Sequence, residues 1–310
     1  MENRMAFQKY PASALLPLLE EIPAFVRARA LKAAQAEPGG INMEEFTEIC
    51  LPLAALIHFQ IMAVRSVRQK AALLTGPAPA AVPFIIGLTG SVASGKSTLA
   101  RLFQHALAAW PEHERAALIT SDGFLHPNKI LEERNLLERK GFPESFDHER
   151  LVDFLLRLKR GEPGVGAPVY SHVHYDVGEE VITLDAPDIV IVEGINMLQQ
   201  QVALANGSHL TATDFIDYSI YLHADEETIQ EWFTARFMAL VAEAGNNPQS
   251  FYNRFVPLSD SELRGVMEFV WQTINGKNLR EHILPTRARA DMILHKQADH
   301  QIAYFELRNL

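Results

Sequence analysis

Residues 84–99 read FIIGLTGSVASGKSTL, an apolar run followed by a glycine-bounded loop and the start of a helical pattern. The segment from Gly90 to Ser97 fits G-x-x-x-x-G-K-[ST], in which backbone N–H groups and a lysine cradle phosphates and a hydroxyl ligates Mg²⁺. A helix beginning near Lys96 would add its free N–H groups and the positive end of its dipole. The stretch therefore predicts a site for the phosphates of a nucleotide.

The composition of the 310-residue chain is that of an ordinary globular protein, with 48% hydrophobic and 21% charged residues. The single cysteine, Cys50, excludes an intramolecular disulfide, and its apolar surroundings predict a small core residue. A formal net charge of −10 argues against a protein that binds nucleic acid mainly through electrostatic attraction. We therefore expect no nucleic-acid partner.

Residues 71–95 contain no charged side chain, which superficially suggests a membrane span. Pro77, Pro79 and Pro83 interrupt this segment, so we expect no transmembrane helix there. The N-terminal sequence MENRMAFQKYPAS lacks a basic start followed by an apolar region, the mark of an export signal. The expected location is therefore the cytoplasm.

Residues 1–80 have helical patterns and no strong strand signal. Asn42, with Glu45 three residues later, resembles a capping box ahead of an apolar stripe. The segment TGPAPAAVP, residues 75–83, has the proline and glycine content of a joint. We expect residues 1–80 to form an N-terminal helical extension packed on a nucleotide-binding domain of residues 81–310.

Apolar strand candidates alternate with helical patterns through the remainder of the chain. This alternation predicts a three-layer α/β/α fold of the P-loop NTPase type with a mainly parallel sheet. The strands are expected near residues 84–89, 116–119, 188–193, 215–222 and 290–294, with a possible edge strand at 302–307, and the helices near 96–109, 151–158, 225–240 and 261–280.

Two acidic residues follow predicted strands directly. Ligands of parallel sheets bind outside the carboxyl ends of the strands, so Asp122 in ITSDGFLHPN is placed to face the terminal phosphate of a nucleotide. Glu193, after the strand DIVIV, could hold Mg²⁺ together with Ser97, because Mg²⁺ prefers oxygen ligands. The alternatives are a turn aspartate before Gly123 and a surface charge at the end of a strand.

The segment YSHVHYD, residues 170–176, offers aromatic and hydrogen-bonding groups that suit a polar organic substrate. His172 and His174 could also suggest zinc, although no acid or cysteine cluster completes such a site. Further along, Arg236 follows Trp232 by one helical turn and could reach a phosphate or a substrate carboxylate.

Several longer strings of this sequence resemble the bacterial type I pantothenate kinases, in the same order along the chain. The resemblance implies ATP-dependent phosphorylation of the primary hydroxyl of pantothenate to 4′-phosphopantothenate, the first step of coenzyme A synthesis. It also implies a homodimer that is inhibited by coenzyme A or its thioesters. The strings are GSVASGKST, TSDGFLHPN, RKGFPESFD, YSHVHYD, DIVIVEGINMLQ, FIDYSIYLHA and NLREHILPTRARA.

The resemblance also assigns residues to roles. It implies ATP and Mg²⁺ as cofactors, with Asp122 as catalytic base, Lys96 and Arg236 as catalytic cations, and Ser97 and Glu193 at the metal. Arg101 matches a basic position linked with coenzyme A inhibition. The implied nucleotide-binding residues are Gly90, Ser91, Val92, Ala93, Ser94, Gly95, Lys96, Ser97, Thr98, Arg101, Lys296 and His300, and the implied pantothenate-binding residues are Asp122, Tyr170, His172, Phe233, Arg236 and Asn278.

The sequence departs from the family at Phe233, where better-known members have tyrosine in W-Y-x-N-R-F. Loss of that hydroxyl would weaken pantothenate binding or widen the pocket, by about 0.5–1.5 kcal/mol for one neutral hydrogen bond. Three alternatives stay open: a uridine-kinase-like enzyme, a phosphoribulokinase-like enzyme, and a regulatory protein that binds ATP and coenzyme A without catalysis. The first 40 residues match poorly, and their role is open.

Overall fold

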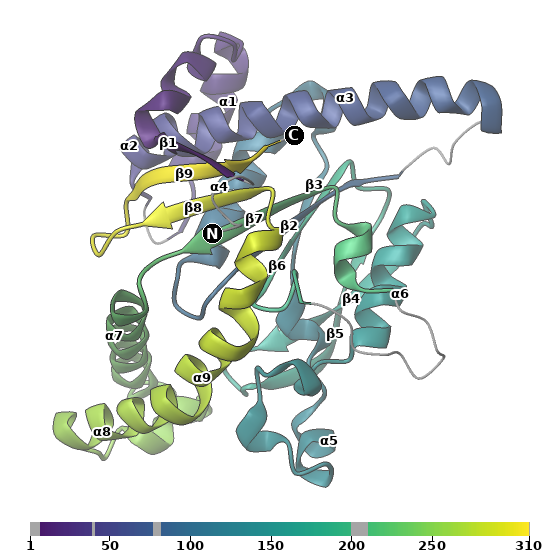
Figure 1. The fold of residues 1–310 in the computed structure, drawn as a ribbon. Coiled ribbons are helices and arrows are strands. Elements are labelled where there is room, and N and C mark those ends of the chain that lie inside the picture. The colour runs from purple at the N-terminus through teal and green to yellow at the C-terminus, as the bar shows by residue number, and fades with distance from the viewer. Residues whose placement is uncertain (1–6, 39–40, 77–81, 200–209, 310) are drawn as a thin grey trace.

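A central sheet organises the protein, which we describe from a computed structural model covering residues 7–38, 41–76, 82–199 and 210–309. Within these ranges the sheet has seven strands in the order β1-β9-β8-β7-β2-β6-β3 (Figure 1). Five neighbouring strands are parallel, which confirms the predicted mainly parallel sheet. They are β8 (Met292–Lys296), β7 (Tyr218–His223), β2 (Phe84–Gly90), β6 (Ile189–Glu193) and β3 (Ala116–Thr120).

One side of the sheet ends in two antiparallel strands. Strand β9 (Ile302–Arg308) pairs with β8, and β1 (Phe7–Pro11) pairs with β9 and covers it. The predicted strand at residues 302–307 is present, but β1 covers its outer side, so it is not the edge of the sheet; the edge strand comes from residues 1–80, which carry no strong strand signal. A five-residue strand is a weak local signal, and β1 forms through tertiary contacts such as the stacking of Tyr10 on Phe305, with ring centroids 5.4 Å apart.

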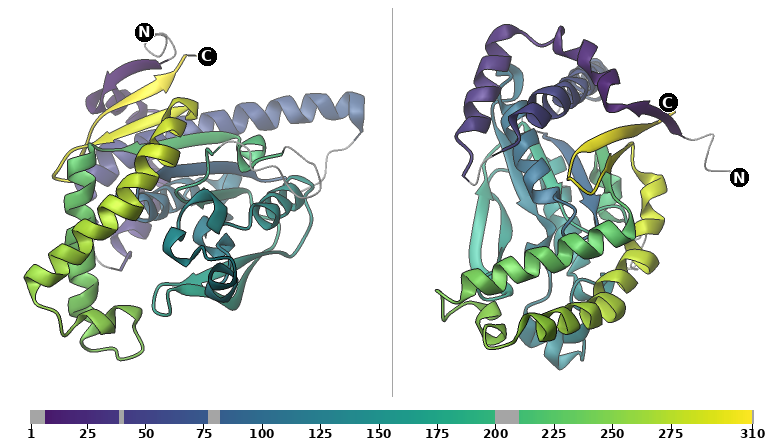
Figure 2. Two further views of the ribbon diagram at one scale, coloured as in Figure 1. Left: turned by 60° about the horizontal axis from the view of Figure 1, so that its bottom comes forward. Right: turned by 90° about the vertical axis from the view of Figure 1, so that its left-hand side faces the viewer.

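Helices cover both faces of the sheet, because alternate side chains of each strand point to opposite faces. Phe84, Ile86 and Leu88 of β2 join the core formed with α1 (Ala24–Gln35), α3 (Leu51–Thr75) and α4 (Lys96–Ala108). Ile85 joins the opposite core, which includes α6 (His148–Lys159). Figure 2 shows the resulting three layers, as the sequence predicted.

A second group of helices lies beyond the carboxyl ends of the parallel strands (Figures 1 and 2). The helix expected at residues 261–280 is divided into α8 and α9 by the π-helical turn Trp271–Asn275. Residues 170–176, the segment YSHVHYD, form the end of a hairpin. The elements are α7 (Glu226–Ala244), α8 (Asp260–Val270) and α9 (Gly276–Asn278), the short helix α5 (Asn128–Glu133), and the hairpin strands β4 (Val165–Ser171) and β5 (Asp176–Leu184). The short helix α2 (Met43–Glu45) instead lies beside α1, at the start of the helical stretch that continues into α3.

The helical stretch Met43–Leu74 is long and apolar enough to cross a membrane by length and composition alone, and 56% of that apolar window is buried. Leu53, Ile57 and Ile61 are fully buried in the core shared with α1 and α4, so the stretch has the features of a core helix. The Asn42 side chain accepts hydrogen bonds from the N–H groups of residues 44 and 45, which is the N-cap half of the expected capping box, and Cys50 is buried as predicted.

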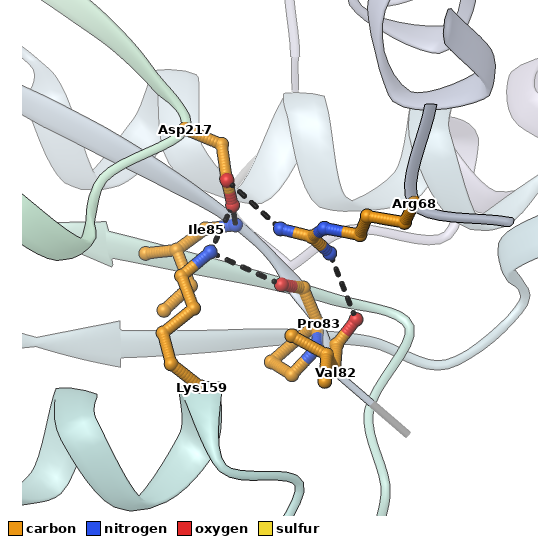
Figure 3. A network of polar contacts seen from close by, with 6 residues as sticks. All are labelled: Arg68, Val82, Pro83, Ile85, Lys159 and Asp217. Carbon is orange, nitrogen blue, oxygen red and sulfur yellow. Dashed lines mark hydrogen bonds and ion pairs between the residues drawn. The ribbon is translucent and has the colours of Figure 1, made fainter. Parts of the chain in front are cut away.

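A charged cluster fixes the amino end of β2 (Figure 3). The carboxylate of Asp217 accepts hydrogen bonds from the N–H of Ile85 at 2.7 Å, from Arg68 of α3 at 3.1 Å, and from Lys159 of α6. Lys159 also donates to the carbonyl of Pro83. The cluster thus ties the central strand to a helix on each face.

The expected boundary between the N-terminal extension and the nucleotide-binding domain, near residue 80, falls at residues 77–81, which lie outside the described residues.

Candidate active site

The carboxyl ends of β2, β3 and β6 meet at one edge of the sheet. Thr120 of β3 and Leu88 of β2 both lie opposite Glu193 of β6, so Asp122 and Glu193 follow neighbouring strand ends. The backbone at Gly194 comes so close to Ser121 that a Cβ there would lie 1.8 Å from the serine hydroxyl. A pocket of about 210 Å³ opens at this edge.

The loop after β2 has the alternating backbone conformation of an anion-binding nest. Gly90, Ala93 and Gly95 have φ values of 145°, 58° and 90°. A Cβ on Gly90 would lie 2.4 Å from the carbonyl oxygen of Leu222, so packing against β7 also requires this glycine. Ala93 holds a left-handed conformation at a cost of about 1–2 kcal/mol, which is typical of strain retained at a functional loop.

Lys96 and Ser97 begin α4 directly after this loop. The ammonium of Lys96 donates to the carbonyl of Ser91 at 2.7 Å, and burial lowers its pKa although the Glu193 and Asp122 carboxylates oppose that change. Ser97 Oγ donates to Glu193 Oε1 at 2.8 Å. A buried cation and a hydroxyl–carboxylate pair therefore lie side by side, an arrangement suited to anionic phosphates.

Asp122 lines the same pocket. Burial raises the pKa of its carboxyl, and the charge of Glu193 raises it further, whereas Lys96, His172 and Lys140 lower it. Its own N–H donates to Thr120 Oγ1, but no group in the described residues donates a hydrogen bond to its carboxylate. This carboxylate is consequently free to accept a proton or a hydrogen bond from a ligand.

The wall opposite the phosphate loop comes from the hairpin and the outer helices. Tyr170 and His172 belong to the β4–β5 hairpin, with ring centroids 5.2 Å apart, and Phe233 and Arg236 belong to α7. Asn278 at the end of α9 donates through Nδ2 to the carbonyl of residue 141 at 2.8 Å. Its Oδ1 is buried with no hydrogen-bond partner in the described part of the chain, so Asn278, which lines the pocket, carries an unsatisfied acceptor.

Several lining residues were not among those predicted, and Lys140 and Tyr252 are two of them. Lys140 donates to Asn128 Oδ1 at 2.7 Å and to the carbonyl of Tyr175 at 2.5 Å, and burial lowers its pKa to about 8. Tyr252 belongs to the turn Phe251–Phe255, and burial raises the pKa of its phenol. The lysine of the string RKGFPESFD is Lys140, so this string could have indicated a cation at the pocket. Nothing local marked Tyr252, because tertiary packing brings its turn to the pocket.

The structure brings most of the predicted residues to this pocket and leaves others beside it. Thr98 is exposed on α4, and Gly90, Ser91, Ser94 and Gly95 complete the loop without lining the cavity. The predicted residues that line the pocket are Val92, Ala93, Lys96, Ser97, Asp122, Tyr170, His172, Glu193, Phe233, Arg236 and Asn278.

Lys296 and His300 lie beside the phosphate loop but outside the pocket lining. The ammonium of Lys296 is 3.4 Å from the carbonyl oxygen of Ser94 and 5.6 Å from the centre of the Trp232 ring. His300 stacks on the same ring, with centroids 4.1 Å apart. Trp232 therefore connects the turn after β8 to the helix that carries Phe233 and Arg236.

Arg101 lies further along α4 and does not line the pocket. Its guanidinium forms an ion pair with Glu37 at 2.8 Å, and the same carboxylate contacts His105 at 2.7 Å. An anionic ligand that used Arg101 would have to compete with this internal carboxylate.

The residues at the strand ends fit a magnesium ion. The described residues hold no group of three or more His, Cys, Asp or Glu side chains that could bind a metal without other ligands. Mg²⁺ needs no such cage, since it keeps several waters and shares the phosphates of a nucleotide. Ser97 and Glu193 would supply two neighbouring oxygen ligands beside the phosphate loop.

Comparisons with known proteins agree with this geometry. Residues 85–239 match the model of the phosphoribulokinase/uridine kinase family. The chain is similar to a pantothenate kinase of Vibrio cholerae, at 41% identity over 94% of each chain. It is also similar to a pantothenate kinase of Mesorhizobium japonicum, at 47% identity over 87% of this chain and 86% of the relative.

The fold is also that of a solved kinase structure. D-glycerate 3-kinase from Cryptococcus neoformans superimposes with a TM-score of 0.57 over 85% of this chain and 98% of its own. At 16% identity this likeness concerns the fold alone.

Proposed function

The chain belongs to the pantothenate kinase family, within the wider phosphoribulokinase/uridine kinase family, and from this membership we propose how its residues divide the reaction. The protein is a kinase that transfers a phosphoryl group from ATP to pantothenate and so forms 4′-phosphopantothenate. The observation that supports our division of roles is a single pocket lined by both Lys96 of the phosphate loop and the unused acceptor of Asn278.

Lys96 and Arg236 stabilise the phosphoryl group as it is transferred. The transition state of phosphoryl transfer is loose, and its negative charge spreads over the phosphoryl oxygens, so positioned cations supply much of the acceleration. Lys96 is costly to bury as a cation, and a bound polyphosphate would offset that cost. Arg236 makes no hydrogen bond or ion pair with any described residue and is available for the phosphoryl group.

Asp122 orients the acceptor hydroxyl and takes its proton. As the hydroxyl oxygen bonds to the terminal phosphorus, the bond to the bridging oxygen of ADP breaks, and the hydroxyl proton passes to the Asp122 carboxylate. The absence of a donor to that carboxylate among the described residues supports this role.

Ser97 and Glu193 hold Mg²⁺ in this proposal. The ion, when bound, would neutralise charge on the phosphates. The hydrogen bond from Ser97 to Glu193 already keeps both oxygens at the end of the phosphate loop.

Tyr170, His172, Phe233 and Asn278 bind pantothenate. The Asn278 Oδ1 atom accepts a hydrogen bond from its amide or hydroxyl groups, which would satisfy a buried acceptor that is otherwise unpaired. Phe233 supplies apolar contact where relatives carry a tyrosine hydroxyl, and Tyr252 supplies a phenol on the same wall.

Regulation and assembly complete the proposal. Coenzyme A or its thioesters inhibit the enzyme in competition with ATP, with Arg101 as the basic residue involved and Lys296 and His300 beside the nucleotide. The enzyme acts in the cytoplasm as a homodimer, and residues 1–80 add helices and the edge strand β1 to the kinase domain of residues 81–310. The inhibition and the homodimer follow from the family resemblance, whereas the location and the division of the chain follow from its sequence patterns.

A panel of acceptors tests the function. We expect ADP release with ATP and Mg²⁺ to depend on pantothenate, and mass spectrometry to detect 4′-phosphopantothenate. Uridine and ribulose 5-phosphate should give only background ADP. Phosphorylation of either alternative acceptor in preference to pantothenate would contradict the assignment, and tight binding of ATP and coenzyme A without any product would favour a regulatory protein.

A further inference from the structure

A buried hydrogen bond joins the two strand ends that carry the acidic residues of the site. Ser121, which precedes Asp122, donates through Oγ to Oδ1 of Asn196 at 2.7 Å, and Asn196 lies three residues after Glu193. Ser121 is fully buried and Asn196 is 3% exposed. The Asn196 Nδ2 atom has no partner within the described ranges, so the hydrogen bond to Ser121 is the side-chain anchor of this asparagine.

The backbone at Gly194 restricts the geometry of the hydrogen bond between Ser121 and Asn196. A Cβ at Gly194 would lie 1.8 Å from Ser121 Oγ and 3.3 Å from Asn196 Oδ1, so only glycine allows the serine hydroxyl to reach the asparagine. The contact therefore depends on Ser121 and Gly194, each next to an acidic residue of the pocket, and on Asn196, and none of the three lines the pocket with a polar side chain.

Charge repulsion at the strand ends explains why the hydrogen bond between Ser121 and Asn196 matters for the site. The carboxylates of Asp122 and Glu193 repel one another across the strand ends, and no donor among the described residues holds the Asp122 carboxylate. Asp122 is thus positioned through its backbone, by its N–H to Thr120 and by the anchoring of Ser121. Without that anchor, the turn after β3 could move away from Glu193 and relieve the repulsion.

We propose that Ser121 and Asn196 are positioning residues that hold Asp122 at its distance from Glu193 and from the acceptor hydroxyl. This inference rests on the proposed role of Asp122 as catalytic base. A displacement of about 1 Å at a reacting group can cost up to about 100-fold in rate, so the contact acts on turnover more than on nucleotide binding.

Turnover of single and double variants tests the proposal. Ser121→Ala and Asn196→Ala should each lower kcat by about 10-fold or more and leave the KM for ATP within about twofold of its original value. Ser121→Thr, which keeps a hydroxyl, should retain most of the turnover. In an Asp122→Asn background, Ser121→Ala should have almost no further effect on kcat, because the residue it positions no longer acts as a base.

Ser219→Ala is the matched control. Ser219 is also buried and donates through Oγ to Asp291 at 2.6 Å, but at the amino end of β7. This variant should lower the melting temperature without lowering kcat. The proposal is overturned if Ser121→Ala only lowers the melting temperature as Ser219→Ala does, or if it lowers kcat equally with and without Asp122. A wild-type turnover for Asp122→Asn would instead overturn the base role itself.

Discussion

The two ends of the parallel sheet each hold an aspartate with neighbouring lysine, but the two aspartates have opposite surroundings. Asp217 at the amino end accepts hydrogen bonds from Arg68, Lys159 and a backbone N–H (Figure 3). Asp122 at the carboxyl end accepts none from the described residues, and burial and Glu193 raise its pKa.

The number of hydrogen-bond donors around each carboxylate distinguishes an aspartate that stabilises the fold from one that is available for catalysis. A carboxylate with several donors strengthens the fold, because each charge-assisted hydrogen bond offsets its desolvation. A carboxylate left without donors costs stability and keeps its hydrogen-bonding capacity for a ligand. The amino end of the sheet therefore fixes β2 in place, and the carboxyl end uses that rigidity to present reactive groups.

The largest expected effect is on turnover at the carboxyl end. Asp122→Asn should lower kcat about 1,000-fold, the order of a lost general base, while ATP binding changes little. Steady-state kinetics with pantothenate and direct titration with a nonhydrolysable ATP analogue measure the two quantities. Asp217→Asn is the control at the other end of the sheet, and its kcat should stay near the original value below its melting temperature.

The second effect is on stability at the amino end. Asp217→Ala should lower the free energy of unfolding by about 3 kcal/mol, because Arg68 and Lys159 would remain partly buried without their shared carboxylate. Urea titration measures this change. An unfolding free energy unaltered by the substitution would show that the cluster in Figure 3 does not hold the sheet together.

The third expected effect is on pantothenate binding, at the pocket wall formed by the hairpin and the outer helices. Asn278→Ala should raise the KM for pantothenate about 10-fold, because it removes the buried Oδ1 acceptor, and leave the KM for ATP nearly constant. Kinetics with each substrate varied in turn check this prediction. Equal losses in both KM values would mean that the asparagine supports the whole site, through its hydrogen bond to residue 141, and does not select the acceptor.

The smallest expected effect is a change of the KM for pantothenate with pH. Burial lowers the pKa of Lys140 to about 8, so its ammonium is charged at pH 7 and loses the proton as the pH rises through 8. If that charge attracts pantothenate, the KM for pantothenate should rise about fivefold between pH 7 and pH 9. Lys140→Arg, which stays charged, should flatten the profile, and an unchanged profile in Lys140→Gln would exclude the lysine as its cause.

The parts of the site that the sheet positions could be predicted from the sequence. Gly90 to Ser97, Asp122 and Glu193 each follow an apolar strand directly, and parallel strands bring such positions to one edge. The three-layer fold followed from the same alternation of strands and helices. Tyr170 and Arg236 were singled out from their local sequence, but only the family resemblance assigned them, together with Asn278, to one substrate site, since no local pattern marks their meeting in one pocket.

The parts that sequence reasoning missed depend on tertiary contacts. Strand β1 forms only by pairing with β9, from the far end of the chain, and Tyr252 reaches the pocket because the N–H of Phe251 donates to the carbonyl of Val173 in the hairpin. The contact between Ser121 and Asn196 likewise joins residues 75 positions apart. Such partners are set by the assembled fold and not by periodicity.

Thermal unfolding of Asp122→Asn beside the original protein tests the central comparison most directly. An acid whose pKa is raised in the folded state costs stability above that pKa, so at neutral pH the neutral asparagine should raise the melting temperature as it abolishes turnover. A lower melting temperature would show that Asp122, like Asp217, stabilises the fold, and would contradict the separation of the two ends.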